Sequence, residues 1–225
     1  MTEGDWLECK DPTAMLKFLQ GKASERKLRL FAVACCRRKW KFFGDDRCRM
    51  AVEIAERFAD DENRVGDLDW AAQGTRLALN EWRPKQGSRG VLVHVSTAAH
   101  ALAQSRNLHV VHIASQLLGL PVDSARARAA EALQQADLLR DAIGNPFCPT
   151  TTDPISRSPT VINLAEAAYD ERVMPSGELD TERLAVLSDA LEEARCDDAD
   201  ILDHLRGPGP HVRGCWVLDL LLRKE

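Results

Sequence analysis

The sequence predicts an all-α protein, a single compact bundle of about eight to ten helices with one proline-rich irregular loop. Alanine and leucine dominate the composition, and both lose little side-chain freedom in a helix. Aromatic residues make up only 5% of the chain, which argues against β-sandwiches and barrels. Capping residues and helix-ending glycines or prolines also recur along nearly the whole chain.

Apolar residues recur at helical spacing between these signals. Asp11 and Pro12 form a good helix start, because an aspartate caps free amides and a proline fits the first helical position. Ser24 is a further capping candidate, Asp45 or Asp46 starts the next helix, and residues 50–58 carry a clear stripe of apolar side chains. The principal helical segments predicted in this way are residues 11–21, 24–44, 45–58, 68–82, 107–118, 123–143, 160–171, 181–194, 197–205 and 211–222.

Two segments interrupt this pattern. Residues 91–95 have the local composition of a strand, but no partner strand is evident and a lone strand leaves its backbone groups unsatisfied. Residues 98–104 continue as helix, so we expect no sheet here. Pro84 is predicted to end the preceding helix, and residues 84–90 form a link that is rich in breakers.

We expect one helical domain over residues 1–225, with a possible subdivision near residues 84–90 or 144–159. A chain of 225 residues is long enough to bury a sizeable core. Neither link is long enough to establish independent domains.

The charge and the cysteines indicate a cytoplasmic protein. The net charge is −5, with 30 basic and 35 acidic residues, whereas a nucleic-acid-binding domain usually carries a basic excess. Residues 1–10 lack the basic start and apolar run of a signal peptide. Apolar stretches such as Cys215–Leu222 are too short to cross a membrane. The seven cysteines are scattered and odd in number, which is typical of reduced thiols.

Three segments resemble a planctomycete-type family of bacterial proteins with no known activity. They are the run Trp6–Trp40, containing DPTAMLKFLQGKASERKLRLFAVACCRRKW, the stretch LLRDAIGNPF at Leu138–Phe147, and the end of the chain at Cys196–Glu225, containing RGPGPHVRGCWVLDLLL. The resemblance covers about half the chain and leaves out roughly residues 60–128. It implies no cofactor and no catalytic residue; by analogy alone it favours an interaction or regulatory role.

The C-terminal segment carries the densest group of candidate binding residues. Two glycines and two prolines at residues 207–210 define a tight connection, and Pro210 is predicted in the first turn of the last helix. Backbone amides there, with Arg206, His211, Arg213 and neighbouring Trp216, form a candidate site for a phosphate or carboxylate. Alternatively, the arginines form ion pairs with nearby acidic residues such as Asp203.

Asp219 lies within a run of apolar residues and is therefore expected to be buried. A buried carboxylate must be paired or protonated. Arg206, or an arginine from another helix, is the expected partner. The catalytic alternative is a general acid or base, although no second carboxylate is clearly placed opposite it.

A metal site is a weaker alternative. His109 and His112 are three residues apart and share a helix face, and Cys35 and Cys36 could complete a site across helices. The cysteines are adjacent, however, so on a helix they point about 100° apart. Buried cysteines also behave as small hydrophobic residues, so we expect no bound metal.

The corner at residues 144–147 offers one further candidate. Gly144 ends a helix, Asn145 and Pro146 form a turn, and Phe147 is predicted to fill the core. Asn145 could face a ligand from this loop. Elsewhere the sequence has no G-x-S-x-G elbow, phosphate-binding glycine loop or dinucleotide-binding fingerprint.

These observations favour a non-enzymatic helical module that binds another protein or regulates one, without a cofactor. One alternative is a metal-dependent or phosphate-handling enzyme that uses the C-terminal histidine, arginine and aspartate residues. A second is a nucleic-acid-binding module that uses Arg37–Lys41. The sequence does not indicate an oligomeric state.

Overall fold

The structure, a computed structural model, describes residues 1–87, 90–104, 109–118, 120, 124–148 and 157–224. These residues form twelve α-helices, two short 3-10 helices and one two-stranded hairpin. The all-α prediction is therefore confirmed. The number of helices slightly exceeds the predicted eight to ten, in part because a short helix at Glu3–Glu8 has no strong sequence pattern.

The contacts divide the chain into two units. The central unit is Cys9–Ala136, and the terminal unit combines Met1–Glu8 with Asp137–Glu225. Their boundary falls within the long helix α8 (Ala125–Ile143). Compactness alone does not make a unit an independently folding domain, so the single domain expected from the sequence stays a prediction.

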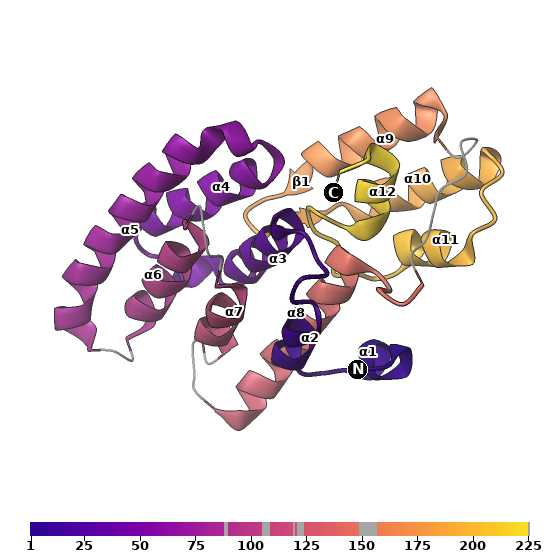
Figure 1. The fold of residues 1–225 in the computed structure, drawn as a ribbon. Coiled ribbons are helices and arrows are strands. Elements are labelled where there is room, and N and C mark those ends of the chain that lie inside the picture. Colours follow the sequence, from indigo (N-terminus) through magenta and orange to yellow (C-terminus); the bar gives the residue numbers. More distant parts are fainter. Residues whose placement is uncertain (88–89, 105–108, 119, 121–123, 149–156, 225) are drawn as a thin grey trace. The chain divides into compact units, whose positions relative to one another are not determined.

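Helices build the central unit. α4, α5 and α6 pack against one another, and α3 packs against α4, α6 and α7 (Figure 1). The elements are α2 (Pro12–Phe18), α3 (Glu25–Arg38), η1 (Trp40–Phe42), α4 (Asp46–Asp60), η2 (Glu62–Arg64), α5 (Val65–Gln86), α6 (Val91–Leu102), α7 (Val110–Leu118) and the first part of α8.

The predicted caps of this unit are confirmed. Asp11, Ser24 and Asp45 each accept a hydrogen bond from a backbone amide in the first turn of the helix that follows. These contacts satisfy amides that have no partner within the helix. Local chemistry thus fixes where α2, α3 and α4 begin.

Two boundaries in this unit differ from prediction. Pro84 does not end α5, which continues to Gln86. A proline there removes one amide donor from the last turn, and the helix stops soon after, at Gly87, whose φ of 69° suits a glycine. α6 begins at Val91, earlier than the helix predicted at residues 98–104, so residues 91–95 are helical and, as expected, form no strand.

The terminal unit is built around a second apolar core. α10 packs against α9 and α11, and α12 packs against α9 and α11. Its elements are α1 (Glu3–Glu8), the end of α8, α9 (Pro159–Asp170), β1 (Arg172–Val173), β2 (Glu178–Leu179), α10 (Thr181–Glu193), α11 (Ala199–Arg206) and α12 (Trp216–Leu222). Leu184, Leu187 and Leu191 form the buried face of α10, because residues three and four positions apart lie on one side of a helix.

Trp6 anchors the N-terminal residues to this unit. Its side chain is fully buried, and its indole N–H donates to the carbonyl of Gly144 at 3.0 Å. Gly144 has a φ of 72°, and a Cβ on it would lie 3.0 Å from Cγ of Trp216. Only a glycine satisfies both the backbone conformation and this close approach.

Three predictions on the terminal unit are wrong. Phe147 does not fill the core and is 39% exposed, because the Asn145 side chain accepts from its amide and turns the chain at the surface. The last helix begins at Trp216, so Pro210 lies outside it. α11 begins at Ala199 and is capped by Asp198, whereas the predicted helix begins at residue 197.

Part of the predicted secondary structure lies outside the described residues. This holds for the helix start at Asp123 and for most of the proline-rich loop, residues 149–156. Within the described part of the chain, no helix is both long enough and apolar enough to cross a membrane.

The burial of Trp6 predicts a large cost for its removal. Trp6→Ala should lower the free energy of unfolding of the terminal unit by roughly 3–5 kcal/mol, because it leaves a cavity and an unpaired carbonyl. Leu7→Ala is the matched control, since Leu7 is 55% exposed. Its effect should stay within about 0.5 kcal/mol. Equal effects in chemical denaturation would contradict the assigned role of Trp6.

Asp45 predicts acid sensitivity of the central unit. Hydrogen bonds from Arg47, and a further one from the Trp82 indole, lower the pKa of Asp45 from 3.8 to about 2. A carboxyl whose pKa is lowered in the folded state stabilises the protein above its ordinary pKa. That stabilisation should be lost as the pH falls from about 4 through about 2. Asp45→Asn should flatten this part of a stability–pH curve; parallel curves for variant and parent would refute it.

Candidate metal centre

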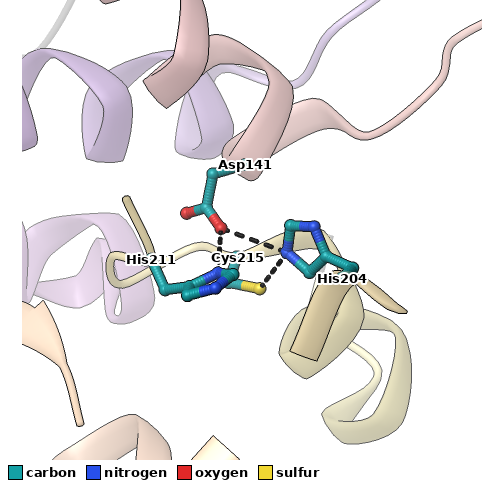
Figure 2. A group of neighbouring side chains, drawn as sticks. All are labelled: Asp141, His204, His211 and Cys215. Carbon is teal, nitrogen blue, oxygen red and sulfur yellow. Dashed lines mark hydrogen bonds and ion pairs between the residues drawn. The ribbon is translucent and has the colours of Figure 1, made fainter. Parts of the chain in front are cut away.

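Four side chains of the terminal unit point toward one another: Asp141, His204, His211 and Cys215 (Figure 2). One potential ligand atom from each residue lies within 4.8 Å of those of the other three. Asp141 comes from α8, His204 from α11, and the other two from the segment between α11 and α12. We call these four residues the Asp-His-Cys cluster. It is the only such group of potential metal ligands among the residues that the structure describes.

Secondary structure positions each member. Asp141 lies in the last turn of α8, on the side of the helix that is buried in the terminal unit. His204 lies in the last turn of α11. The backbone of His211 is held by β2, because the amide of Leu179 donates to the His211 carbonyl at 2.9 Å. Val212 adds an isolated bridge to Glu178.

The distances within the cluster are short. Oδ1 of Asp141 lies 3.1 Å from Nδ1 of His211 and 3.2 Å from Nε2 of His204. The same Nε2 of His204 lies 3.2 Å from Sγ of Cys215. One ring nitrogen therefore faces both the carboxylate and the thiol.

Two further contacts orient the cluster from outside. The amide of Val212 donates to Oδ2 of Asp141 at 2.9 Å, which directs the other carboxylate oxygen into the cluster. Nε2 of His211 lies 3.1 Å from the carbonyl of Gly207. Because a carbonyl can only accept, Nε2 carries the proton and Nδ1 faces Asp141.

Charge within the cluster shifts two pKa values. Burial alone would raise the pKa of Asp141, but hydrogen bonds with His204 and His211 outweigh it, so the pKa is lowered. Burial alone would lower the pKa of His211, but the hydrogen bond and negative charge of Asp141 and the Gly207 carbonyl raise it. Both directions favour a charged carboxylate beside a positive neighbour.

Trp216 packs beside the cluster. Its ring lies 5.2 Å from that of His204, and the His204 and His211 rings meet edge to face at 4.8 Å. Trp216 in turn contacts Gly144, to which Trp6 is hydrogen-bonded. Residues from both ends of the chain thus support the same site.

The residues predicted to form an anion site do not come together as one group. Of its members, His211 is in the Asp-His-Cys cluster and Trp216 beside it. Arg206 is exposed and pairs with Asp189 and Glu192 of α10 rather than with Asp219. Arg213 lies over the Tyr169 ring and 3.6 Å from Asp170.

The two remaining candidate binding residues, Asp219 and Asn145, have different surroundings. Asp219 is buried, as its apolar neighbours predicted, with 3% of its surface exposed. Asn145 donates to Glu3 and accepts from the amide of Phe147. One contact closes the turn that follows α8, and the other holds this turn against the N-terminal residues.

The alternative metal ligands of the central unit do not assemble into a comparable group in the described part of the chain. Cys35 and Cys36 are fully buried in α3. Burial raises the pKa of both thiols, which disfavours the thiolate that metals and nucleophilic chemistry require. His109 and His112 are exposed.

Most of the basic run at Arg37–Lys41 is paired with acidic side chains. Arg37 is buried and forms an ion pair with Glu56 at 2.5 Å. Arg38 and Lys39 both approach Glu131, at 3.6 and 2.8 Å. Little of this charge faces the solvent, although Lys41 is exposed.

Asp141, His204 and Cys215 were not among the site residues predicted from the sequence. A signal was present, because two histidines and a cysteine occur within twelve residues in the pattern H-x6-H-x3-C. Asp141 lies 70 positions before His211, and nothing local marks it. Only the folded chain brings it to the cluster.

A scan against protein-family profiles found no match, and searches of curated proteins and of solved structures found none either. The resemblance to a planctomycete-type family therefore stays a prediction. The function of the Asp-His-Cys cluster is therefore inferred from its geometry.

Asp141 is predicted to stabilise the terminal unit even when a chelator keeps metals away. Asp141→Asn removes the negative charge that faces two histidines, and should lower the free energy of unfolding by roughly 2–3 kcal/mol. Asp137→Asn is the control, because Asp137 forms only a partly exposed ion pair with Arg140 on the same helix, worth about 0.5 kcal/mol. Similar losses in urea denaturation would show that Asp141 is no more important than a surface charge.

Proposed function

We propose that the terminal unit binds one divalent transition-metal ion, zinc foremost, and that the protein acts as a metal-stabilised helical module. One observation carries the proposal: four side chains of metal-binding type converge from α8, α11 and the segment before α12. The ion would tie these three segments together. The proposal adds a metal that composition and spacing alone did not lead us to expect.

The distances suit a metal ion. Zinc bonds of about 2.0–2.3 Å in a tetrahedron place neighbouring ligand atoms about 3.3–3.6 Å apart. Three pairs in the cluster lie at 3.1–3.2 Å. The four ligand atoms together spread over at most 4.8 Å, so side-chain rotations that bring the wider pairs closer would seat an ion.

The donor set indicates the class of metal. Two imidazoles, one thiol and one carboxylate are a mixture that zinc and related transition metals accept. Calcium and magnesium prefer sites made of oxygen alone. Contacts from the Val212 amide and to the Gly207 carbonyl resemble the outer hydrogen bonds that orient metal ligands elsewhere.

The orientation of His211 also calls for a positive charge within the cluster. With its proton on Nε2, the lone pair of Nδ1 faces a carboxylate oxygen of Asp141. Two acceptors so close repel unless a cation lies between them. A metal ion supplies that charge; the metal-free alternative is a second proton on His211.

A cysteine–histidine nucleophile is less well supported. In a catalytic triad, one ring nitrogen of the histidine faces the nucleophile and the other faces the carboxylate. Here Nε2 of His204 faces both Cys215 and Asp141. Convergence on one nitrogen fits ligands around a common ion better than a relay of protons.

The other predicted functions have weaker support. The ion pairs of Arg37, Arg38 and Lys39 leave little free charge for a nucleic acid. Arg206 is occupied by carboxylates rather than free to bind phosphate. A protein-interaction role is compatible with a metal that stabilises the fold, because the outer surface stays open to a partner.

Metal content tests the proposal. Protein purified under reducing conditions without added metal should contain about one zinc ion per chain, and zinc returned after chelation should raise the melting temperature. Cys215→Ser should lose most of the metal, because it removes the thiolate. Cys196→Ser is the matched control: Cys196 lies in the same unit but outside the cluster.

Two results would overturn the proposal. One is parent protein that holds no metal and whose melting temperature does not respond to zinc, cobalt or nickel. The other is equal metal content in the Cys215 and Cys196 variants. The first would leave a proton-bridged ion pair between Asp141 and His211 as the explanation of the cluster.

A further inference from the structure

The four members of the Asp-His-Cys cluster differ in burial. The side chains of Asp141 and His211 are each 3% exposed, and Cys215 is fully buried. The His204 side chain is 19% exposed. His204 is therefore the member that solvent reaches.

They also differ in how firmly their surroundings hold them. Asp141 accepts from the Val212 amide through the oxygen that is turned away from the cluster. His211 donates to the Gly207 carbonyl, and the Cys215 amide donates to the Val212 carbonyl. These contacts fix the side chains of Asp141 and His211 and the backbone of Cys215 independently of any metal.

The His204 ring, unlike the side chains of Asp141 and His211, has no hydrogen bond outside the cluster among the described residues. Both of its polar contacts use Nε2, the nitrogen that faces the cluster. Its ring is otherwise positioned by packing against His211 and Trp216. Packing of this kind leaves rotation of the side chain less restricted than a hydrogen bond to Nδ1 would.

The supporting segments show the same asymmetry. Asp141 belongs to the 19-residue helix α8, and the His211 backbone is hydrogen-bonded to β2. His204 lies near the end of α11, a helix of eight residues that stops at Gly207. His204 thus comes from a much shorter helix than Asp141 does.

We infer that Asp141, His211 and Cys215 hold the metal permanently, while His204 occupies an exchangeable position that a water molecule or another small donor can take. The inference rests on the proposed metal site. Three protein ligands with one open position are the arrangement of zinc sites that bind water or substrate, whereas four permanent ligands make a closed structural site. The terminal unit would then present a metal ion to small ligands from the side of His204.

The experiment uses the whole chain with cobalt as a coloured substitute for zinc. His204→Gly and His211→Gly are the matched pair, because each removes one imidazole from the same cluster. His204→Gly should keep about one cobalt ion per chain, and added imidazole should restore the parent's visible spectrum. His211→Gly should lose most of its cobalt, and imidazole should not restore it.

The parent protein gives an independent measurement should a glycine variant fail to fold. Imidazole or azide added to its cobalt form should change the visible spectrum in a saturable way as the small ligand replaces His204. A closed site would give no change. Circular dichroism of each variant identifies loss of folding.

Specific outcomes overturn the inference. One is equal loss of cobalt from the two glycine variants when both are folded. Another is a parent spectrum that does not respond to small ligands although cobalt is bound, which leaves the proposed metal site intact as a closed one. Failure of the parent to bind cobalt or zinc at all would instead remove the proposed function and this inference with it.

Discussion

The terminal unit depends on the burial of one carboxylate. α8 carries Asp141 into the interior, where only 3% of its side chain is exposed. An unpaired carboxylate in such a place costs several kcal/mol, so the surrounding chain must supply donors or positive charge. The segment from His204 to Cys215 meets that requirement with two imidazoles and the Val212 amide. Its tight course through residues 207–210 brings these groups to a single point.

The central unit also pairs its buried charged groups, but it does so with arginines. Arg37 of α3 pairs with Glu56 of α4, and both are buried. Arg29 reaches the carbonyl of Leu102 and the carboxylate of Glu25. In each case a permanent cation meets an acceptor. The terminal unit instead places histidines and a cysteine around its carboxylate, groups whose charge depends on protons or metal ions, and this difference separates a candidate site from a structural ion pair.

Local chemistry made much of the fold predictable. The caps at Asp11, Ser24 and Asp45 act within a few residues, and sequence spacing reveals them directly. The burial of Asp219 followed from its apolar neighbours. Phe147 was wrongly predicted to fill the core. The side chains that pack at Gly144 are instead those of Trp6 and Trp216, and only the folded chain brings them there.

The candidate site was predictable only in part. His211 was singled out for its position in a glycine- and proline-rich connection, but its expected companions Arg206 and Arg213 are paired with acidic side chains. Asp141, the carboxylate that faces both histidines, lies in α8, whose sequence shows only the polar and apolar residues of an ordinary helix. No local rule separates a carboxylate that faces solvent from one that a distant loop will cover.

The discontinuity of the terminal unit has a consequence for synthesis of the chain. Trp6, near the beginning, is buried against residues that come after the whole central unit. The central unit is one continuous stretch, so all of its residues, 9–136, leave the ribosome before residues 137–225 of the terminal unit do. The first eight residues must wait for the last ninety or so. Until residues 137–225 have been made, the Trp6 indole lacks the Gly144 carbonyl to which it donates, so the terminal unit is completed after the central unit.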